Sequence, residues 1–114
     1  MIKMKQINVI LGGKNYKNKG IFFPESNSLK LLKGACIRKT GGSTYKFENI
    51  RQERISKYCH EETDFFILDK DVVFDTPTAA AKFCAGNEVN GPSAWRTMDG
   101  IKIKDLKIKY SNFC

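Results

Sequence analysis

The stretch Phe74–Gly100 reads FDTPTAAAKFCAGNEVNGPSAWRTMDG and specifies its own local structure more completely than any other part of the chain. Thr76 is suited to accept backbone N–H groups as an N-cap, and Pro77 is suited to the first position of a helix. Gly86 is suited to the left-handed conformation that ends a helix. These three signals predict a helix over residues 77–85.

The predicted helix has many alanines and few large side chains. At 100° per residue, its apolar residues cover one broad face and leave Thr78 and Lys82 as the exposed stripe. Small side chains allow a helix to lie close to a sheet or to another helix. We therefore expect this helix to have a mainly structural role.

Two glycine turns and the only tryptophan follow this helix. Asn90-Gly91 predicts a turn with positive φ, and Asp99-Gly100 predicts a second turn. Trp95 lies between them in a short extended segment, where a lone Trp is typical of the core or its edge. The alternative is that Trp95 and Arg96 belong to a nucleic-acid surface, because Trp stacks on bases and Arg contacts phosphates.

Alternating apolar residues upstream of Phe74 predict strands. We expect a strand from Ile2 to Leu11 with a bulge near Lys5-Gln6, a turn over residues 12–20, and a second strand at Ile21–Phe23 that completes a hairpin. A third strand over residues 29–38 contains Gly34, which is typical of a bulge or a close backbone approach. Two further strands, 65–68 and 72–74, are predicted to form a hairpin.

Residues 46–60 predict an amphipathic helix whose apolar half contains two arginines. One interpretation is that Arg51 and Arg54 lay their methylenes along the core and direct their charge to solvent or to an ion pair. The other is that Arg51 lines a cleft, where its planar guanidinium would bind a phosphate or a base edge. Arg38 and Lys39 begin a basic, glycine-containing loop that is either a plain connection or a phosphate site.

The charge balance points to a polyanionic partner. Twenty Lys and Arg against 12 Asp and Glu give a formal charge of +8 in 114 residues. Nucleic acid is the commonest partner of such a chain, although a lysine-rich surface also serves solubility. Alternation over residues 101–110 predicts strands that direct lysines away from the core, as a basic stripe made of Lys102, Lys104, Lys107 and Lys109.

Other function classes receive no support from the sequence. Apolar runs are far shorter than the ~20 residues that span a bilayer, and the N-terminus has no secretory signal, so we expect a cytoplasmic protein without a membrane span. Four widely spaced cysteines and one histidine predict neither a metal site nor a disulfide framework. No acid–base set is recognisable, so we expect no cofactor and no enzymatic activity.

One pattern links the opening stretch to segments on either side of it. It comprises Phe74-x-Thr76-Pro77-Thr78-Ala79-Ala80-Ala81, Ala85-Gly86, Asn90-Gly91, Trp95, Asp99-Gly100, Ile103 and Leu106, with Lys33-Gly34-Ala35 and Ile50-Arg51-Gln52-Glu53-Arg54-Ile55 upstream. This pattern resembles the bacterial domain-of-unknown-function family DUF4357 over residues 20–106. The resemblance implies a domain found beside nuclease or restriction-modification modules. It also implies similarity to the restriction-and-adenine-methylase-associated domain, for which recognition of modified DNA is proposed.

We expect one α+β domain, residues 1–114, with a mostly antiparallel sheet and two helices packed on one face. The expected function is a non-enzymatic accessory module that binds DNA or is associated with DNA modification. The alternative is a protein-interaction or structural module of a restriction-type system. Its expected partners are DNA and a nuclease or methyltransferase. Six residues, expected to share one recess framed by the two helices, would contact the DNA: Arg38, Lys39, Arg51, Arg54, Trp95 and Arg96.

Overall fold

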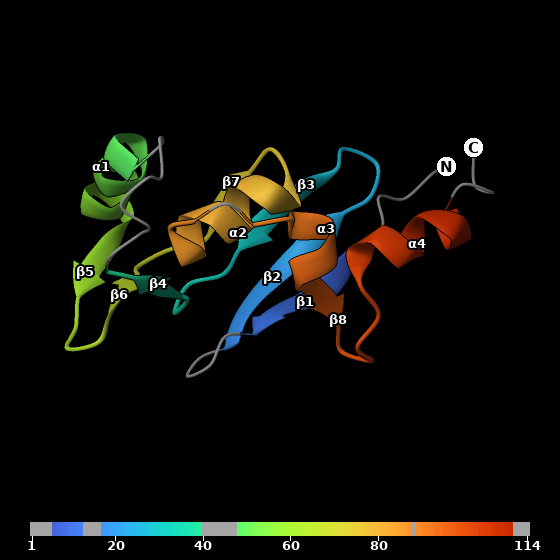
Figure 1. Ribbon diagram of the computed structural model, residues 1–114, viewed down its shortest axis with the longest axis horizontal. Coiled ribbons are helices and arrows are strands. Elements are labelled where there is room, and N and C mark those ends of the chain that lie inside the picture. Colours follow the sequence, from blue (N-terminus) through green and yellow to red (C-terminus); the bar gives the residue numbers. More distant parts are fainter. Residues whose placement is uncertain (1–5, 13–16, 40–47, 88, 111–114) are drawn as a thin grey trace.

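Antiparallel strands form two sheets in the computed structural model of the chain, which describes residues 6–12, 17–39, 48–87 and 89–110 (Figure 1). The five-stranded sheet has the order β7-β3-β2-β1-β8, and the three-stranded sheet has the order β4-β6-β5. The first contains β1 (Ile7–Gly12), β2 (Lys17–Phe23), β3 (Ser28–Leu31), β7 (Val72–Phe74) and β8 (Trp95–Thr97). The second contains β4 (Cys36–Arg38), β5 (Cys59–Glu61) and β6 (Phe65–Leu68).

Four helices complete the α+β fold, which confirms the expected class. They are α1 (Glu48–Tyr58), α2 (Pro77–Ala85), α3 (Gly91–Ala94) and α4 (Ile103–Tyr110). Helices α2 and α3 lie over one face of the five-stranded sheet, and α1 lies beside the three-stranded sheet (Figure 1). None of the helices in the described part of the chain is both long and apolar enough to cross a membrane.

Strand alternation gives the five-stranded sheet a core face and an outer face. The side chains on the core face belong to one hydrophobic cluster, to which the three-stranded sheet and helices α1, α2 and α4 also contribute. Trp95 is completely buried in this cluster, and its Nε1 donates a hydrogen bond of 3.0 Å to the carbonyl of Pro77 in α2. The outer face carries the residues of opposite parity, Asn8, Ile10, Lys17, Lys19, Ile21, Lys30, Val73 and Arg96.

Helix α2 forms as its end signals predict. Thr76 Oγ1 accepts a hydrogen bond of 3.0 Å from the backbone N–H of Ala79, and Pro77 begins the helix. Gly86 has a φ of 71° and donates its N–H to the carbonyl of Lys82. The small face of α2 packs in the core, where Ala80 and Ala81 are fully buried.

The predicted third strand is divided between the two sheets. Residues 28–31 pair with β2 as β3, whereas residues 36–38 pair with β6 as β4. Gly34, with a φ of 93°, lies in the turn between them and is not a bulge. The side chain of Asn18 then bonds both main-chain groups of Cys36, with Oδ1 accepting at 2.7 Å and Nδ2 donating at 2.9 Å. This buried amide joins β2 to β4.

The expected hairpin of residues 65–68 and 72–74 is wrong, although both strands exist. Strand β6 pairs with β4 and β5, and β7 pairs with β3 in the other sheet. The Asp69-Lys70-Asp71 segment therefore connects the two sheets and does not close a hairpin. Its position is fixed in part by the N–H of Lys33, which donates to Asp71 Oδ1 at 2.8 Å.

Three other local predictions are corrected. Asn90 has a φ of −85° and caps α3, so Asn90-Gly91 is a helix start and not a turn with positive φ. Residues 103–110 form α4 and not strands, which excludes the extended stripe of Lys102, Lys104, Lys107 and Lys109. Strand β2 begins at Lys17, within the segment expected to be a turn.

The predicted bulge at Lys5-Gln6 includes Lys5, which lies outside the described residues. So does most of the basic loop over residues 38–43.

Candidate functional site

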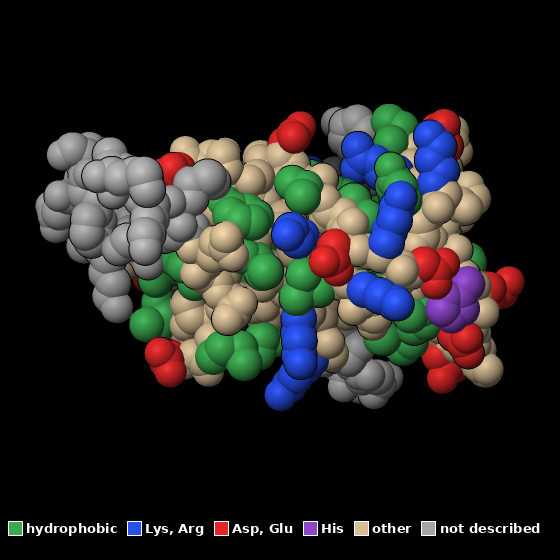
Figure 2. Space-filling model, turned by 180° about the vertical axis from the view of Figure 1, so that it is seen from behind, with side chains coloured by type: hydrophobic (Ala, Val, Ile, Leu, Met, Phe, Trp, Pro, Cys, Tyr) green, Lys and Arg blue, Asp and Glu red, His purple; other side chains and the backbone are tan. Residues whose placement is uncertain are grey.

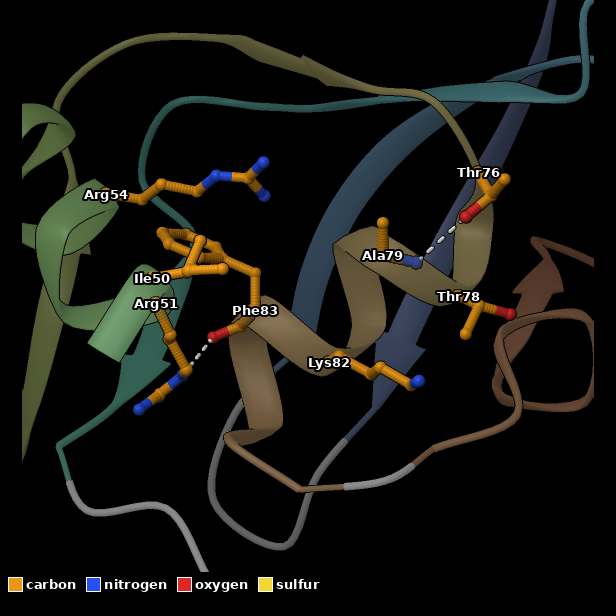
Figure 3. Close-up of a pocket in the computed structure, with 8 residues that line it drawn as sticks. All are labelled: Ile50, Arg51, Arg54, Thr76, Thr78, Ala79, Lys82 and Phe83. Carbon is orange, nitrogen blue, oxygen red and sulfur yellow. Dashed lines mark hydrogen bonds between the residues drawn. The ribbon is translucent and has the colours of Figure 1, made fainter. Parts of the chain in front are cut away.

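A pocket of about 320 Å³ lies between α1 and α2 (Figure 3). Helix α1 contributes Ile50, Arg51 and Arg54. The segment of α2 and its cap contributes Thr76, Thr78, Ala79, Lys82 and Phe83. The described lining residues include three cations and two hydroxyls around an apolar wall, and no carboxylate is among those described residues. This composition is suited to an anion with an apolar part.

Arg51 lines this pocket but is a buried structural side chain, only 3% exposed. Its Nε donates a hydrogen bond of 2.8 Å to the carbonyl of Phe83, and its Nη2 donates to the carbonyl of Arg38. The interpretation in which Arg51 directs its charge to solvent is therefore wrong. Arg51 ties α1 to the end of α2 and to β4, because one planar guanidinium donates in several directions.

Arg54 is exposed and lies one helical turn further along α1. Its guanidinium carbon lies 5.6 Å from the centre of the Phe74 ring, a cation–π contact. In Figure 3 its guanidinium extends from α1 across the space in front of α2. Arg54 is thus the predicted site residue that is best placed to meet a ligand in the pocket.

Arg38 and Lys39 lie at the end of β4 in the three-stranded sheet. Arg38 is the last residue of β4 and its side chain is exposed. Lys39 Nζ forms an ion pair of 2.9 Å with Glu61 Oε2 and lies 5.7 Å from the centre of the Phe66 ring. Its charge is therefore partly neutralised by a carboxylate of β5, the strand on the far side of β6.

Trp95 and Arg96 point to opposite sides of β8. Trp95 faces the core and has no exposed surface, so its ring supports α2 and is not accessible to a ligand in this structure. Arg96 is exposed on the outer face, opposite Ile10 of β1. The six residues predicted from sequence consequently occupy four places, and only Arg51 and Arg54 share the expected recess.

The outer face of the five-stranded sheet presents a second candidate surface. We call Lys17, Lys19, Lys30 and Arg96 the basic sheet face. The five strands contain no Asp or Glu. Seen from behind the view of Figure 1, basic and hydrophobic side chains share the middle of the molecule, with an acidic side chain among them, and further acidic side chains gather around the histidine at one end (Figure 2).

Sequence reasoning did not assign Lys17 or Lys19 to a surface, because residues 12–20 were interpreted as a turn. The positions that alternate with these lysines in β2 are Asn18 and Gly20, which are both buried but are neither large nor apolar. Gly20 leaves room for Trp95, whose ring would lie 3.1 Å from a Cβ at that position. The exposed lysines at every second position were the only available signal for this strand.

The acidic end of the molecule contains the single histidine. His60 Nδ1 lies 2.5 Å from Asp69 Oδ1, and His60 Nε2 lies 3.0 Å from Glu62 Oε2. The hydrogen bond to Asp69 raises the pKa of His60 above its usual value, and Glu62 acts in the same direction. These contacts favour the imidazolium form, which donates from both nitrogens.

Two of the cysteine thiols in the described part of the chain have a raised pKa. Cys36, Cys59 and Cys84 are thiols and not disulfides. Burial raises the pKa of Cys84 to about 12, and burial together with the charge of Asp69 raises the pKa of Cys59 to about 11. Within the described residues, no three His, Cys, Asp or Glu side chains are grouped so that they could hold a metal ion.

A scan against protein families matches residues 10–107 to the model described as Domain of unknown function (DUF4357). The match begins ten residues before the segment in which the resemblance was noted from sequence. No curated protein and no solved structure matches the chain.

Proposed function

Because the chain belongs to the DUF4357 family, a domain of unknown function, we propose its role from its surfaces: a non-enzymatic accessory module that binds DNA through the basic sheet face. The observation that carries the proposal is the charge of this face. Four cations project from strands that contain no Asp or Glu. A surface with an excess of positive charge attracts a polyanion and increases its local concentration.

Strand pairing sets the spacing of the cations. Ile10 pairs with Lys19 on one side and with Arg96 on the other, so the two cations lie two strands apart. That separation is about 10 Å, given the usual distance between neighbouring strands. Lys30 pairs with Ile21 and Val73 in a parallel row. The cations would contact phosphates while the apolar side chains between them contact sugars and bases.

The proposal predicts strong dependence on salt, because each neutralised phosphate releases counterions. We expect a fluorescently labelled oligonucleotide to bind in an anisotropy titration at low salt and to dissociate as salt is added. The variant Lys19→Gln/Lys30→Gln/Arg96→Gln should bind less tightly, and its log–log salt slope should fall by about 0.7–0.9 for each lost phosphate contact.

The matched control is Lys57→Gln/Lys70→Gln, which removes lysines from α1 and from the segment after β6. Both lysines are exposed and lie in the half of the molecule that contains the three-stranded sheet. The control should retain the slope of the original protein. Absence of binding to duplex, methylated and single-stranded DNA at low salt would refute the proposal.

A second candidate function is supported by exposed apolar side chains near the same face. Val73 is 60% exposed on the outer face and Met98 is 66% exposed in the turn after β8. Exposed apolar residues of this kind are typical of a surface that binds another protein. The family resemblance suggests that this partner would be a nuclease or a methyltransferase. A protein interface of this kind would show weak salt dependence and would be lost in Val73→Asp/Met98→Asp.

A further inference from the structure

The pocket between α1 and α2 has the composition of a ligand site and takes no part in the sheet-face proposal. Its volume of about 320 Å³ is within the range of small-molecule sites. Ile50, Ala79 and Phe83 supply apolar wall, and Ile50 is half exposed although it is a large hydrophobic residue. An exposed isoleucine beside a hollow is stabilised when an apolar body covers it.

Two cationic side chains that line this pocket favour a negatively charged ligand. Arg54 extends from α1 towards α2, and Lys82 belongs to α2 itself (Figure 3). Among the described residues that line the pocket there is no Asp or Glu. A ligand held here would therefore place an anionic group near Arg54 and its apolar body against Ile50 and Ala79.

A second hollow continues the pocket along the exposed stripe of α2. It is lined by Val89, Asn90 and Pro92 together with Thr78 and Lys82, the two residues that also line the first pocket. The two hollows thus have two residues of α2 in common, and the second extends to the start of α3. Such an extended site accommodates a ligand longer than an inorganic anion.

We propose that this pocket binds a single nucleotide, with its phosphate at Arg54 and its base against the apolar wall formed by Ile50, Ala79 and Phe83. The required chemistry is an anionic phosphate joined to a flat, largely apolar body. A free nucleotide and the terminal nucleotide of a DNA strand both have this chemistry. The site lies among the helices, so it is separate from the basic sheet face.

Binding is tested by adding deoxyadenosine monophosphate, deoxyadenosine or inorganic phosphate to the ¹⁵N-labelled full chain and following amide shifts by NMR. The nucleotide should give saturable shifts at Thr78, Ala79 and Arg54, with an affinity about tenfold or more above that of either part, because both interactions are then made together. Equal binding of phosphate alone, or shifts confined to the basic sheet face, would overturn the proposal.

Two variants test separately the charge of the pocket and the space within it. Arg54→Gln should weaken nucleotide binding about tenfold, consistent with loss of one charge-assisted contact. Ala79→Leu should fill the pocket and abolish binding without a change of charge. If either variant, confirmed as folded by its NMR spectrum, binds the nucleotide as the original chain does, the assigned site is wrong.

The sheet-face triple variant serves as the control that distinguishes this site from the proposed DNA surface. It should bind the mononucleotide unchanged, even if the DNA-binding proposal fails. If an oligonucleotide displaces the bound nucleotide, the ligand of the pocket is the terminal nucleotide of a DNA strand. If the oligonucleotide does not displace it, the ligand of the pocket is a free nucleotide.

Discussion

Arg51 illustrates how a charged residue on the apolar side of a helix can stabilise a fold. Its guanidinium donates to main-chain carbonyls of Phe83 and Arg38, which belong to two other elements. Buried carbonyls require donors, and a nearly buried arginine supplies several from one side chain. The helical pattern alone identified the anomaly but did not reveal these partners.

We predict that Arg51→Met lowers the free energy of unfolding by about 3 kcal/mol, because buried carbonyls lose charged donors. Arg51→Lys should recover only part of this loss, since an ammonium cannot reproduce the fork of a guanidinium. Urea unfolding followed by circular dichroism measures both effects. The control is Arg54→Gln on the same helix, for which about 1 kcal/mol or less is expected from an exposed cation–π contact. Equal losses at the two positions would contradict the structural role of Arg51.

His60 is predicted to titrate above the ordinary value of histidine. Its pKa is raised chiefly by the hydrogen bond to Asp69, with a further contribution from Glu62. Since the folded pKa exceeds the unfolded value of about 6.5, its stabilising contribution is complete below that pH and is lost as pH rises through the folded pKa.

Proton NMR can follow His60 without assignment, because the chain contains a single histidine. The midpoint should fall in Asp69→Asn, and should fall less in Glu62→Gln. A midpoint at or below about 6.5 in the original protein would show that the two carboxylates do not contact the ring in solution.

At the scale of the elements, α2 was predicted correctly because its determinants are local. Thr76, Pro77 and Gly86 act within one or two turns of the residues that they cap. Strand partners were predicted less well, because pairing depends on residues far away in the chain. Nothing near residues 65–74 indicates that β6 and β7 belong to different sheets.

Helix α4 was misassigned for a different physical reason. Over a few residues, alternation fits both a strand and one turn of a helix, and the buried Ile103 and Leu106 are also three positions apart. Asp105 interrupts the alternation between them and falls in the first turn of the observed helix, where an acidic residue is favoured. That interruption was a helical signal, although it was interpreted as a break between two strands.

Gly91 shows how closely α2 and α3 approach one another. A Cβ at this position would lie 2.2 Å from the backbone nitrogen of Thr78 and 2.4 Å from the carbonyl carbon of Pro77. Neither atom can move without moving α2. We predict that Gly91→Ala destabilises the protein by about 3 kcal/mol or more, at the upper end of the range for overpacking.

Thermal unfolding of Gly91→Ala is compared with that of Gly12→Ala. Gly12 has no atom within 4 Å of an added Cβ, so its substitution should be neutral or slightly stabilising. If Gly91→Ala unfolds like the control, the contact between the two helices is looser than the structure indicates.

At the scale of the whole molecule, the fold is elongated, with extents of 43 × 26 × 24 Å. One hydrophobic cluster nevertheless contains Leu31 of the larger sheet together with Ile37 and Leu68 of the smaller one. A shared core opposes separate unfolding of the two halves. We therefore predict a single cooperative transition.

Two natural probes test this prediction, because the only tryptophan lies in the larger sheet and the only histidine in the smaller. Fluorescence of Trp95 and the NMR signal of His60 should report the same midpoint in urea. Distinct midpoints would show that the three-stranded sheet and α1 unfold independently.

The candidate sites could be predicted only in part. Sequence indicated excess positive charge and placed two arginines beside a recess, and α1 and α2 do form one around Arg51 and Arg54. It also favoured a core position for Trp95, which is buried. It did not indicate that Lys17 and Lys19 belong to a strand or that they share a face with Arg96. Those facts depend on the order and register of strands, which are set by packing across the whole chain.

Asn18 imposes a constraint on how this chain can change during evolution. Its side-chain amide bonds the backbone N–H and carbonyl of Cys36, as a neighbouring strand would do. Along β2, Asn18 alternates with the outward-facing lysines at positions 17 and 19. Inserting or deleting one residue in β2 would reverse this alternation, burying lysines and turning the amide to solvent. The same event would detach β4. Length variation should therefore be rare within this strand among homologues, even where the identity of the outward residues varies.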